Sequence, residues 1–217
     1  MNVTRLYTYW RSSAAFRVRI ALNFKGIAYD AVPTHLLRDG GAQHGTAYRA
    51  INPQGLIPAL EDADNLIVQS LAIIEYLEET HPQPPLLPAA PAARATVRAM
   101  ALSIACDIHP LGNLRVLQYL RAEFGQGDEA IARWNREWMS RGFTALETWI
   151  ARHSADDRHC FGAEVTLADV CLLPQVFNSR RVQLDLALWP RLAAVARHLE
   201  GLPAFAAARP EAQPDAE

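Results

Sequence analysis

The order of strand-like and helix-like segments at the start of the chain limits the fold more than any other feature of the sequence. Residues 3–8 alternate apolar and polar side chains as a strand does, and residues 13–25 carry apolar side chains at helical spacing. Residues 28–32 again favour a strand. A strand–helix–strand unit brings its two strands together in parallel through a right-handed crossover.

The segments that follow predict the rest of a small mixed sheet. Residues 43–50 favour a short helix, residues 57–61 and 65–68 favour a hairpin, and residues 70–80 favour a helix. The predicted order for this half is therefore strand, helix, strand, helix, strand, strand, helix.

A proline-rich stretch separates this half from a second one of different texture. Residues 81–88 read HPQPPLLP, and proline both ends the preceding helix and stiffens a linker. We therefore expect a domain over residues 1–82, a linker over residues 83–90 and an all-helical domain over residues 91–217.

The second domain is rich in alanine and leucine, which favours helices. Apolar residues recur at helical spacing in four segments, near residues 91–124, 128–152, 166–177 and 188–200. Two prolines and few apolar residues in the stretch 209–217 predict an extended or frayed end.

Composition excludes several classes of function. Half of the 217 residues are hydrophobic and the formal net charge is −2, which is typical of globular proteins and offers no basic surface for nucleic acid. The apolar stretches are too short to cross a membrane, and the first residues lack the pattern of a secretory signal. Three widely spaced cysteines predict neither a disulfide framework nor a metal site, and they fit a reducing, cytoplasmic location.

Two serines lie at the junction between the first strand and the first helix, in the stretch YWRSSAAFRVRIAL. Ser12 or Ser13 fits a helix N-cap, whose side-chain oxygen accepts a hydrogen bond from a free backbone N–H. The same junction offers unpaired N–H groups and the positive end of a helix dipole to an anion such as a thiolate. The stretch by itself leaves both interpretations open.

Two further stretches carry chemistry. In Ile57-Pro58 a proline opens a strand, where it cannot donate a ladder hydrogen bond. A cis peptide bond would turn the backbone of Ile57 outward to pair with an extended peptide, and an ordinary edge-strand proline is the alternative. Gln69-Ser70 begins a helix, where Ser70 is either a simple cap or part of a carboxylate site.

Together these residues resemble the cytosolic glutathione transferases, and the run from Arg11 to Leu22 is similar to their zeta class. The shared features are a thioredoxin-like half without Cys-x-x-Cys, an Ile-Pro turn, a Gln-Ser helix start and an all-helical second half. The resemblance covers essentially the whole chain. It implies an α/β thioredoxin-like N-terminal domain followed by an all-α C-terminal domain.

The resemblance also implies a glutathione site. Ser12, Ser13 and Arg11 would be catalytic, with both serines beside the glutathione sulfur. The other implied glutathione contacts are Gln43 at the glycine end, the backbone of Ile57-Pro58 at the cysteinyl part, Gln69 and Ser70 at the γ-glutamyl carboxylate, and His109, Asn113, Leu114 and Arg115 in a stretch that closes over the site. The arginines implied to bind substrate carboxylates are Arg11, Arg115 and Arg181.

The implied activity is glutathione-dependent cis–trans isomerisation by a homodimer. In the zeta class, the thiolate adds reversibly to the cis double bond of maleylacetoacetate, a dicarboxylic enoic diketo acid, and fumarylacetoacetate leaves with glutathione regenerated. The alternatives are maleylpyruvate isomerisation, glutathione conjugation or α-haloacid dehalogenation, and a non-catalytic binding protein. The class pattern often has a cysteine where this chain has Ala14, which weakens any mechanism that needs a protein thiol.

Other polar residues favour plain structural roles. Arg17 and Arg19 are two apart on one helix, so we expect at least one of them to form an ordinary salt bridge or to face solvent. The His-, Asp- and Cys-containing stretch 153–160 matches no metal-ligand spacing and is expected to be a polar loop. Thr166 and Asp169 predict a capping box before the next helix.

Overall fold

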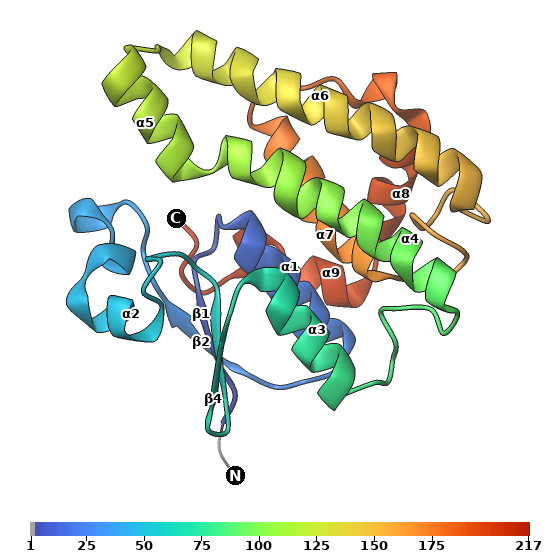
Figure 1. Cartoon of the computed structure of the whole chain (residues 1–217), viewed down its shortest axis with the longest axis horizontal. Helices are drawn as coiled ribbons and strands as arrows, with labels where there is room; N and C mark the ends of the chain where they lie inside the picture. The colour runs from blue at the N-terminus through green and yellow to red at the C-terminus, as the bar shows by residue number, and fades with distance from the viewer. Residues whose placement is uncertain (1–2) are drawn as a thin grey trace. The chain divides into compact units, whose positions relative to one another are not determined.

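A computed structural model describes residues 3–217, so residues 1 and 2 of the predicted first domain lie outside the described residues. The chain divides into two compact units (Figure 1). Unit 1 comprises the chain up to Pro85 together with Leu202–Glu217, and unit 2 comprises Leu86–Gly201.

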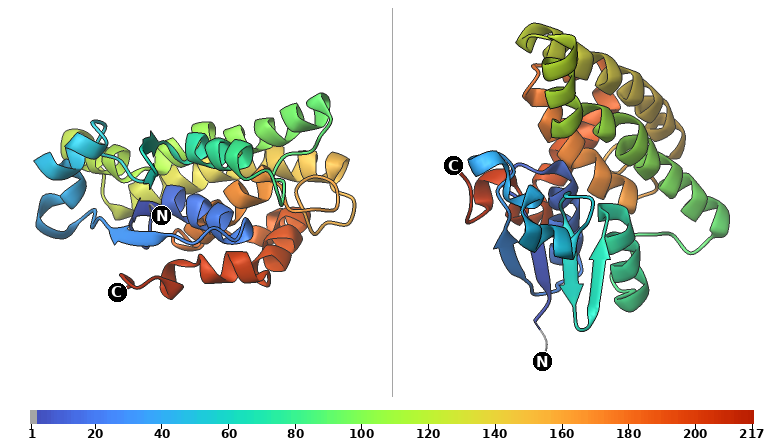
Figure 2. Two further views of the ribbon diagram at one scale, coloured as in Figure 1. Left: turned by 90° about the horizontal axis from the view of Figure 1, so that it is seen from below. Right: turned by 60° about the vertical axis from the view of Figure 1, so that its left-hand side comes forward.

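Unit 1 is built on a mixed sheet whose strand order is β2-β1-β3-β4. The strands are β1 (Arg5–Thr8), β2 (Asp30–Pro33), β3 (Ala59–Asp62) and β4 (Asn65–Val68). β1 and β2 pair in parallel, whereas β3 pairs antiparallel with both β1 and β4. The right-hand view of Figure 2 shows the β3–β4 hairpin at one edge of the sheet. The predicted parallel pair and the predicted hairpin are both confirmed.

The helices of unit 1 cover the sheet and connect its strands. Helix α1 (Ser13–Phe24) is the crossover between β1 and β2, and it packs against α3 (Ser70–Thr80) and α9 (Pro203–Ala207) (Figure 1). The short helices η1 (Arg38–Gly40), η2 (Ala42–His44) and α2 (Thr46–Ile51) connect β2 to β3. Fully buried apolar side chains such as Phe16 and Ile73 form the core, and each contributes roughly 1.5–3 kcal/mol.

Unit 2 is helical. Its α-helices are α4 (Pro91–Leu102), α5 (Leu114–Phe124), α6 (Asp128–His153), α7 (Leu167–Arg180) and α8 (Pro190–Glu200). A short turn, η5 (Leu186–Leu188), precedes α8. Helix α7 packs against α4, α6 and α8 and is buried along nearly its whole length, which makes it the centre of this unit.

The helix predicted over residues 91–124 is interrupted in the structure. The segment 91–124 is not a single helix, because a π-helical turn η3 (Ser103–Ile108) and a 3-10 turn η4 (His109–Gly112) separate α4 from α5. Pro110 has no backbone N–H to extend the preceding helix, and Asn113 starts a new one by accepting from the N–H of Arg115 at 3.2 Å.

The stretch 209–217 is folded rather than extended or frayed, which differs from the prediction: Pro210–Ala212 form a 3-10 turn, and Asp215 Oδ2 accepts from the N–H of Trp10 at 3.0 Å. The residues just before it contact helix α1. Asn23 Nδ2 donates to the carbonyl of Ala204 at 3.2 Å, and Arg19 Nε donates to the carbonyl of Ala208 at 3.0 Å. These contacts with α1 place Leu202–Glu217 in unit 1, whereas the sequence predicted a helical domain that runs to residue 217. Unit 1 also extends to Pro85, inside the predicted linker 83–90.

Among residues 3–217, no helix combines the length and the apolar character that a membrane span requires.

Candidate active site

The turn from β1 into α1 is stabilised by a serine cap. The N–H of Ser12 donates to the carbonyl of Tyr9 at 2.9 Å, which reverses the chain directly before the helix. Ser12 has an extended backbone, and its Oγ accepts from the N–H of Ala15 at 3.2 Å. The sequence left open which serine is the N-cap, and the structure assigns that role to Ser12.

The cap leaves donors available at the start of α1. The N–H of Phe16 donates to the carbonyl of Ser12, but within residues 3–217 the N–H groups of Ser13 and Ala14 have no hydrogen-bond partner. The hydroxyl of Ser13 has none in the same range, and Ser12, whose oxygen already accepts, still has its O–H to donate. Two N–H and two O–H donors at the positive end of a helix dipole suit one anion.

Arg11 adds a cation next to these donors. Its side chain is exposed, and its guanidinium carbon lies 5.3 Å from the centroid of the Trp10 ring. This cation–π contact keeps the guanidinium on the same turn as Ser12. Arg11 is therefore available to a negatively charged group that approaches the start of α1.

For at least one of Arg17 and Arg19, the sequence predicted either an ordinary salt bridge or exposure to solvent. The second alternative is wrong, because both side chains are buried. Arg17 Nη1 donates to Ser70 Oγ at 3.4 Å, and Arg19 donates to the carbonyls of Tyr9 at 3.3 Å and Trp10 at 3.1 Å. Burial lowers the pKa of Arg19 to about 10, which leaves it charged at neutral pH. The sequence offered one signal for this burial: apolar residues flank both arginines in FRVRIAL.

Ile57 presents an unpaired backbone to the same region. The Ile57-Pro58 peptide bond is cis, which confirms one of the two alternatives for this turn. In the described chain, neither the N–H nor the C=O of Ile57 makes a backbone hydrogen bond. Its side chain is buried in an apolar cluster with Tyr9, Ala15 and Tyr48, which holds it beside the first turn of α1. The backbone of Ile57 is thus available to an extended peptide that lies next to Ser12.

Gln69 and Ser70 form a second helix start with open donors. Gln69 has φ 72°, which is uncommon for a residue other than glycine, and its Nε2 donates to Gln54 Oε1 at 2.7 Å. No side chain caps α3, and within residues 3–217 the N–H groups of Ser70 and Leu71 have no hydrogen-bond partner. The start of α3 can therefore hold a carboxylate.

Gln43 is buried in η2 and organises its loop. Its Nε2 donates to the carbonyl of Leu36 at 3.2 Å. Gly41 has φ 95°, and a Cβ atom there would lie 2.5 Å from Gln43 Nε2, so this packing requires glycine at residue 41. A contact between Gln43 and the glycine end of glutathione stays a prediction.

In unit 2 the predicted stretch 109–115 spans a helix junction. His109 begins η4, Asn113 is the N-cap of α5, Leu114 is half-buried and Arg115 is exposed. The cap hydrogen bond gives Asn113 a structural role in its own unit. The binding roles of these four residues stay predictions.

The pair Arg180-Arg181 ends helix α7. Arg180 forms an ion pair with Glu200, whereas the exposed Arg181 has Nη1 at 3.5 Å from Asn178 Oδ1. Arg181 therefore stays the predicted substrate contact of this pair.

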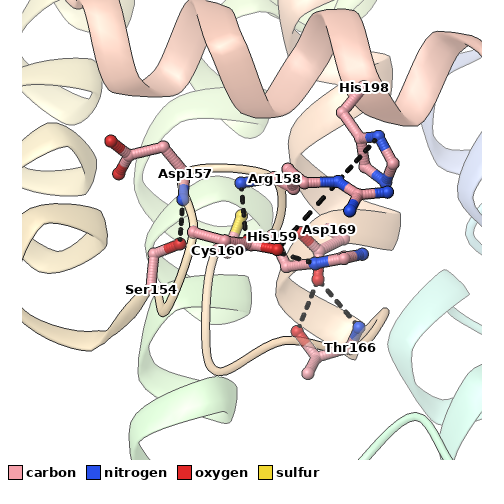
Figure 3. Close-up of polar contacts among 9 residues, drawn as sticks. Ser154, Asp157, Arg158, His159, Cys160, Thr166, Asp169 and His198 are labelled. Carbon is pink, nitrogen blue, oxygen red and sulfur yellow. Dashed lines mark hydrogen bonds and ion pairs between the residues drawn. The ribbon is translucent and has the colours of Figure 1, made fainter.

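The polar loop before α7 is held by its own hydrogen bonds, as Figure 3 shows. The buried carboxylate of Asp169 accepts from the N–H and the hydroxyl of Thr166, both at 2.8 Å, and from the N–H of Cys160 at 2.7 Å. These contacts confirm the predicted capping box. Burial raises the pKa of the Cys160 thiol, which disfavours its thiolate. Among residues 3–217, no three or more His, Cys, Asp or Glu side chains are grouped to hold a metal ion.

Comparison with known proteins matches both units to one family. A model described as the N-terminal domain of glutathione S-transferase matches residues 6–85, and one described as its C-terminal domain matches residues 117–201. A curated relative from Vibrio cholerae serotype O1, named probable maleylacetoacetate isomerase, is 53% identical over 211 residues, which is 97% of each chain.

Two solved structures are similar over nearly the full length. One is the holo structure of maleyl pyruvate isomerase, described as a bacterial zeta-class glutathione S-transferase. It has a TM-score of 0.95 and 45% identity, over 98% of this chain and 100% of that one. The other is maleylacetoacetate isomerase from Methylobacterium extorquens AM1 with bound malonate and glutathione. It has a TM-score of 0.93 and 42% identity, over 98% of this chain and 99% of that one.

Proposed function

The chain belongs to the glutathione S-transferase family, and from that premise we propose that it is a glutathione-dependent cis–trans isomerase that converts maleylacetoacetate into fumarylacetoacetate. The observation that carries the proposal is the start of α1, where Ser12 caps the helix and leaves two N–H and two O–H donors for one anion. All three cysteines lie in unit 2, so unit 1 provides a thiolate site without a thiol of its own.

The donors at α1 stabilise the charged form of a thiol. Each hydrogen bond to a charged group contributes about 1.5–3 kcal/mol. Two such bonds, from Ser12 and Ser13, would lower a free thiol pKa of about 8.5 toward neutrality. When bound, glutathione supplies this thiolate, which adds reversibly to the cis double bond and so permits rotation to the trans isomer before it leaves.

The remaining donors of unit 1 suit the ends of the tripeptide. The backbone N–H and C=O of Ile57 can pair with the cysteinyl residue as an added strand does. The start of α3 at Ser70 can take the γ-glutamyl carboxylate, and the loop that carries Gln43 can take the glycine end. These three contacts would fix the sulfur at the start of α1.

Exposed arginines suit a substrate with two carboxylates. Arg11 in unit 1 and Arg115 and Arg181 in unit 2 are exposed, and a guanidinium binds a carboxylate through a planar pair of N–H groups. The relative from Methylobacterium extorquens, which holds malonate together with glutathione, supports a dicarboxylate site. We assign Arg11, beside the serine turn, to a substrate carboxylate. Arg115 and Arg181 stay the predicted carboxylate ligands of unit 2.

Maleylpyruvate is the second candidate substrate, because the similar zeta-class structure is named for that activity. The test compares kcat/KM for freshly prepared maleylacetoacetate and maleylpyruvate at saturating glutathione. A higher kcat/KM for maleylacetoacetate supports the proposal, and a higher value for maleylpyruvate replaces it with the second candidate. Turnover of neither, with turnover of a haloacid or of a conjugation substrate, would contradict isomerisation.

Two further properties belong to this proposal. Dependence on reduced glutathione and three free cysteines support a cytoplasmic location, where the glutathione pool is kept reducing. Membership of the family supports a homodimer. Sedimentation equilibrium tests the second statement, since a monomer at micromolar concentration would contradict it.

A further inference from the structure

The end of the chain contacts the turn that carries the two serines. We call residues 208–217 the tail. The backbone N–H of Trp10 donates to Oδ2 of Asp215 at 3.0 Å. Trp10 is two residues before Ser12, so the tail holds the chain directly before the start of α1.

A buried arginine, Arg19, also binds this turn, through its backbone carbonyls. Arg19 donates to the carbonyls of Tyr9 at 3.3 Å and Trp10 at 3.1 Å, and its Nε donates to the carbonyl of Ala208 at 3.0 Å. Arg19 therefore binds both the turn and the beginning of the tail. The carbonyls of Tyr9 and Trp10 thus accept from Arg19 of helix α1, and the N–H of Trp10 donates to Asp215 of the tail.

The tail also reaches the loop that carries Gln43. Glu217 forms an ion pair with Arg38, and its Oε1 lies 3.2 Å from Nε2 of His35. The His35 ring packs edge-on against Tyr9 with 4.9 Å between ring centroids. The N–H of Ala42, next to Gln43, donates to the carbonyl of His35 at 2.8 Å. One short segment thus contacts both loops that the proposed function assigns to glutathione.

The tail is ordered by its own contacts. Gln213 is buried, and its Nε2 donates to the carbonyls of Ala207 at 3.0 Å and Arg209 at 2.8 Å. Pro210 is also buried and begins a 3-10 turn, η6 (Pro210–Ala212). Because the segment before Asp215 is already fixed, the carboxylate of Asp215 can hold the Trp10 peptide in one place.

We propose that the tail positions the glutathione site, with Asp215 and Glu217 as positioning residues that hold the serine turn and the Gln43 loop in their binding geometry. The inference rests on the proposed function, because it names the same site. It adds Asp215 and Glu217, which lie more than 200 positions from Ser12 in the sequence. Preorganised loops bind a flexible tripeptide with a smaller loss of entropy.

The test measures glutathione affinity by calorimetry in three single-residue variants and the parent chain. Asp215→Ala removes the acceptor, Asp215→Asn keeps an acceptor oxygen but removes the charge, and Glu211→Ala removes a charge from the exposed part of the tail. We expect Asp215→Ala to weaken glutathione binding about tenfold, and Asp215→Asn and Glu211→Ala to bind like the parent. We also expect the Trp10 amide to exchange faster with solvent in Asp215→Ala only.

A positioning role also predicts how the kinetics divide. In Asp215→Ala the KM for glutathione should rise while kcat at saturating glutathione stays close to that of the parent. Parent-like glutathione affinity in Asp215→Ala would overturn the inference, and so would an equal loss of affinity in Asp215→Asn. If Asp215→Ala does not fold, Glu217→Ala is the deciding variant. We expect it to bind glutathione about threefold more weakly than the parent chain. Unchanged binding in that variant would overturn the role of the tail.

The inference and the proposed function fail in different ways. A parent chain that binds glutathione but isomerises neither maleyl compound contradicts the proposed function. The glutathione affinities and the Trp10 amide exchange of the variants still decide the role of the tail in that case.

Discussion

The hydroxyl oxygen of Ser12 accepts a hydrogen bond from the backbone N–H of Ala15 at 3.2 Å, and this contact determines where helix α1 begins. The same hydroxyl keeps its hydrogen for another partner. Ser12 can therefore cap the helix and donate to a bound thiolate at the same time, so the two interpretations of the serine pair are compatible.

This dual role predicts two separable effects of Ser12→Ala. Loss of the cap should lower the free energy of unfolding by about 1 kcal/mol, and loss of the O–H donor should raise the thiol pKa of bound glutathione. Denaturant unfolding measures the first effect, and the ultraviolet absorbance of the thiolate against pH measures the second. Ser12→Thr keeps both the oxygen and its hydrogen and is the control; an equal rise of the thiol pKa in that variant would contradict the assignment.

Ser13→Ala should affect the chemistry without affecting stability. The Ser13 hydroxyl has no hydrogen-bond partner within residues 3–217, so its removal costs the fold little. We expect a higher thiol pKa for bound glutathione and a rate lowered roughly 10- to 100-fold, with the midpoint of unfolding unchanged. An unchanged thiol pKa would leave Ser12 as the sole hydroxyl donor.

Arg11→Ala should change the binding of charged substrates selectively. The guanidinium is exposed next to Ser12, and its loss removes a bidentate contact to a carboxylate. We expect the KM for the diacid to rise about tenfold and the KM for an uncharged electrophile to stay the same. Arg11→Lys keeps the charge without the planar pair and should lie between the two. Equal increases of KM for both substrates would show that Arg11 does not bind a carboxylate.

His198 of helix α8 contacts Arg158 and His159 of the loop in Figure 3, and its environment predicts a pH dependence of stability. Burial lowers the pKa of His198, and the charges of Arg158 and His159 lower it further. The carboxylates of Asp156 and Asp169 oppose this shift. Since the unfolded chain then binds a proton more readily than the folded one, the free energy of unfolding should fall as the pH drops below about 6.5. Urea unfolding between about pH 5.5 and 7.5 measures this. His198→Asn should flatten the curve, and an unchanged slope in that variant would assign the dependence to other groups.

The parts of the fold that follow from local patterns could be predicted from the sequence. The parallel strand pair, the hairpin and the capping box at Thr166 each depend on neighbours within a few dozen residues. The cis bond before Pro58 also has a local signal, since a proline at the start of a strand cannot join the ladder.

The parts that depend on distant contacts could not be predicted. Asp215 and Trp10 are 205 residues apart, and no local pattern around Asp215 indicates a folded tail. The apolar neighbours of Arg19 in FRVRIAL are a local signal for its burial, but nothing local indicates its hydrogen-bond acceptor in the tail, the carbonyl of Ala208. The break in the helix before Asn113 differs from these cases, because Pro110 and Gly112 are a local signal against a continuous helix that the prediction did not use.

The most direct test of glutathione-dependent isomerisation is an assay with less glutathione than substrate. Maleylacetoacetate is supplied in large excess over glutathione, fumarylacetoacetate is measured as it forms, and total free thiol is counted before and after. For an isomerase we expect many product molecules for each glutathione, an unchanged thiol count and no enzyme-catalysed reaction without glutathione. Product that stops at the amount of glutathione added, with thiol lost in proportion, would contradict isomerisation and indicate conjugation instead.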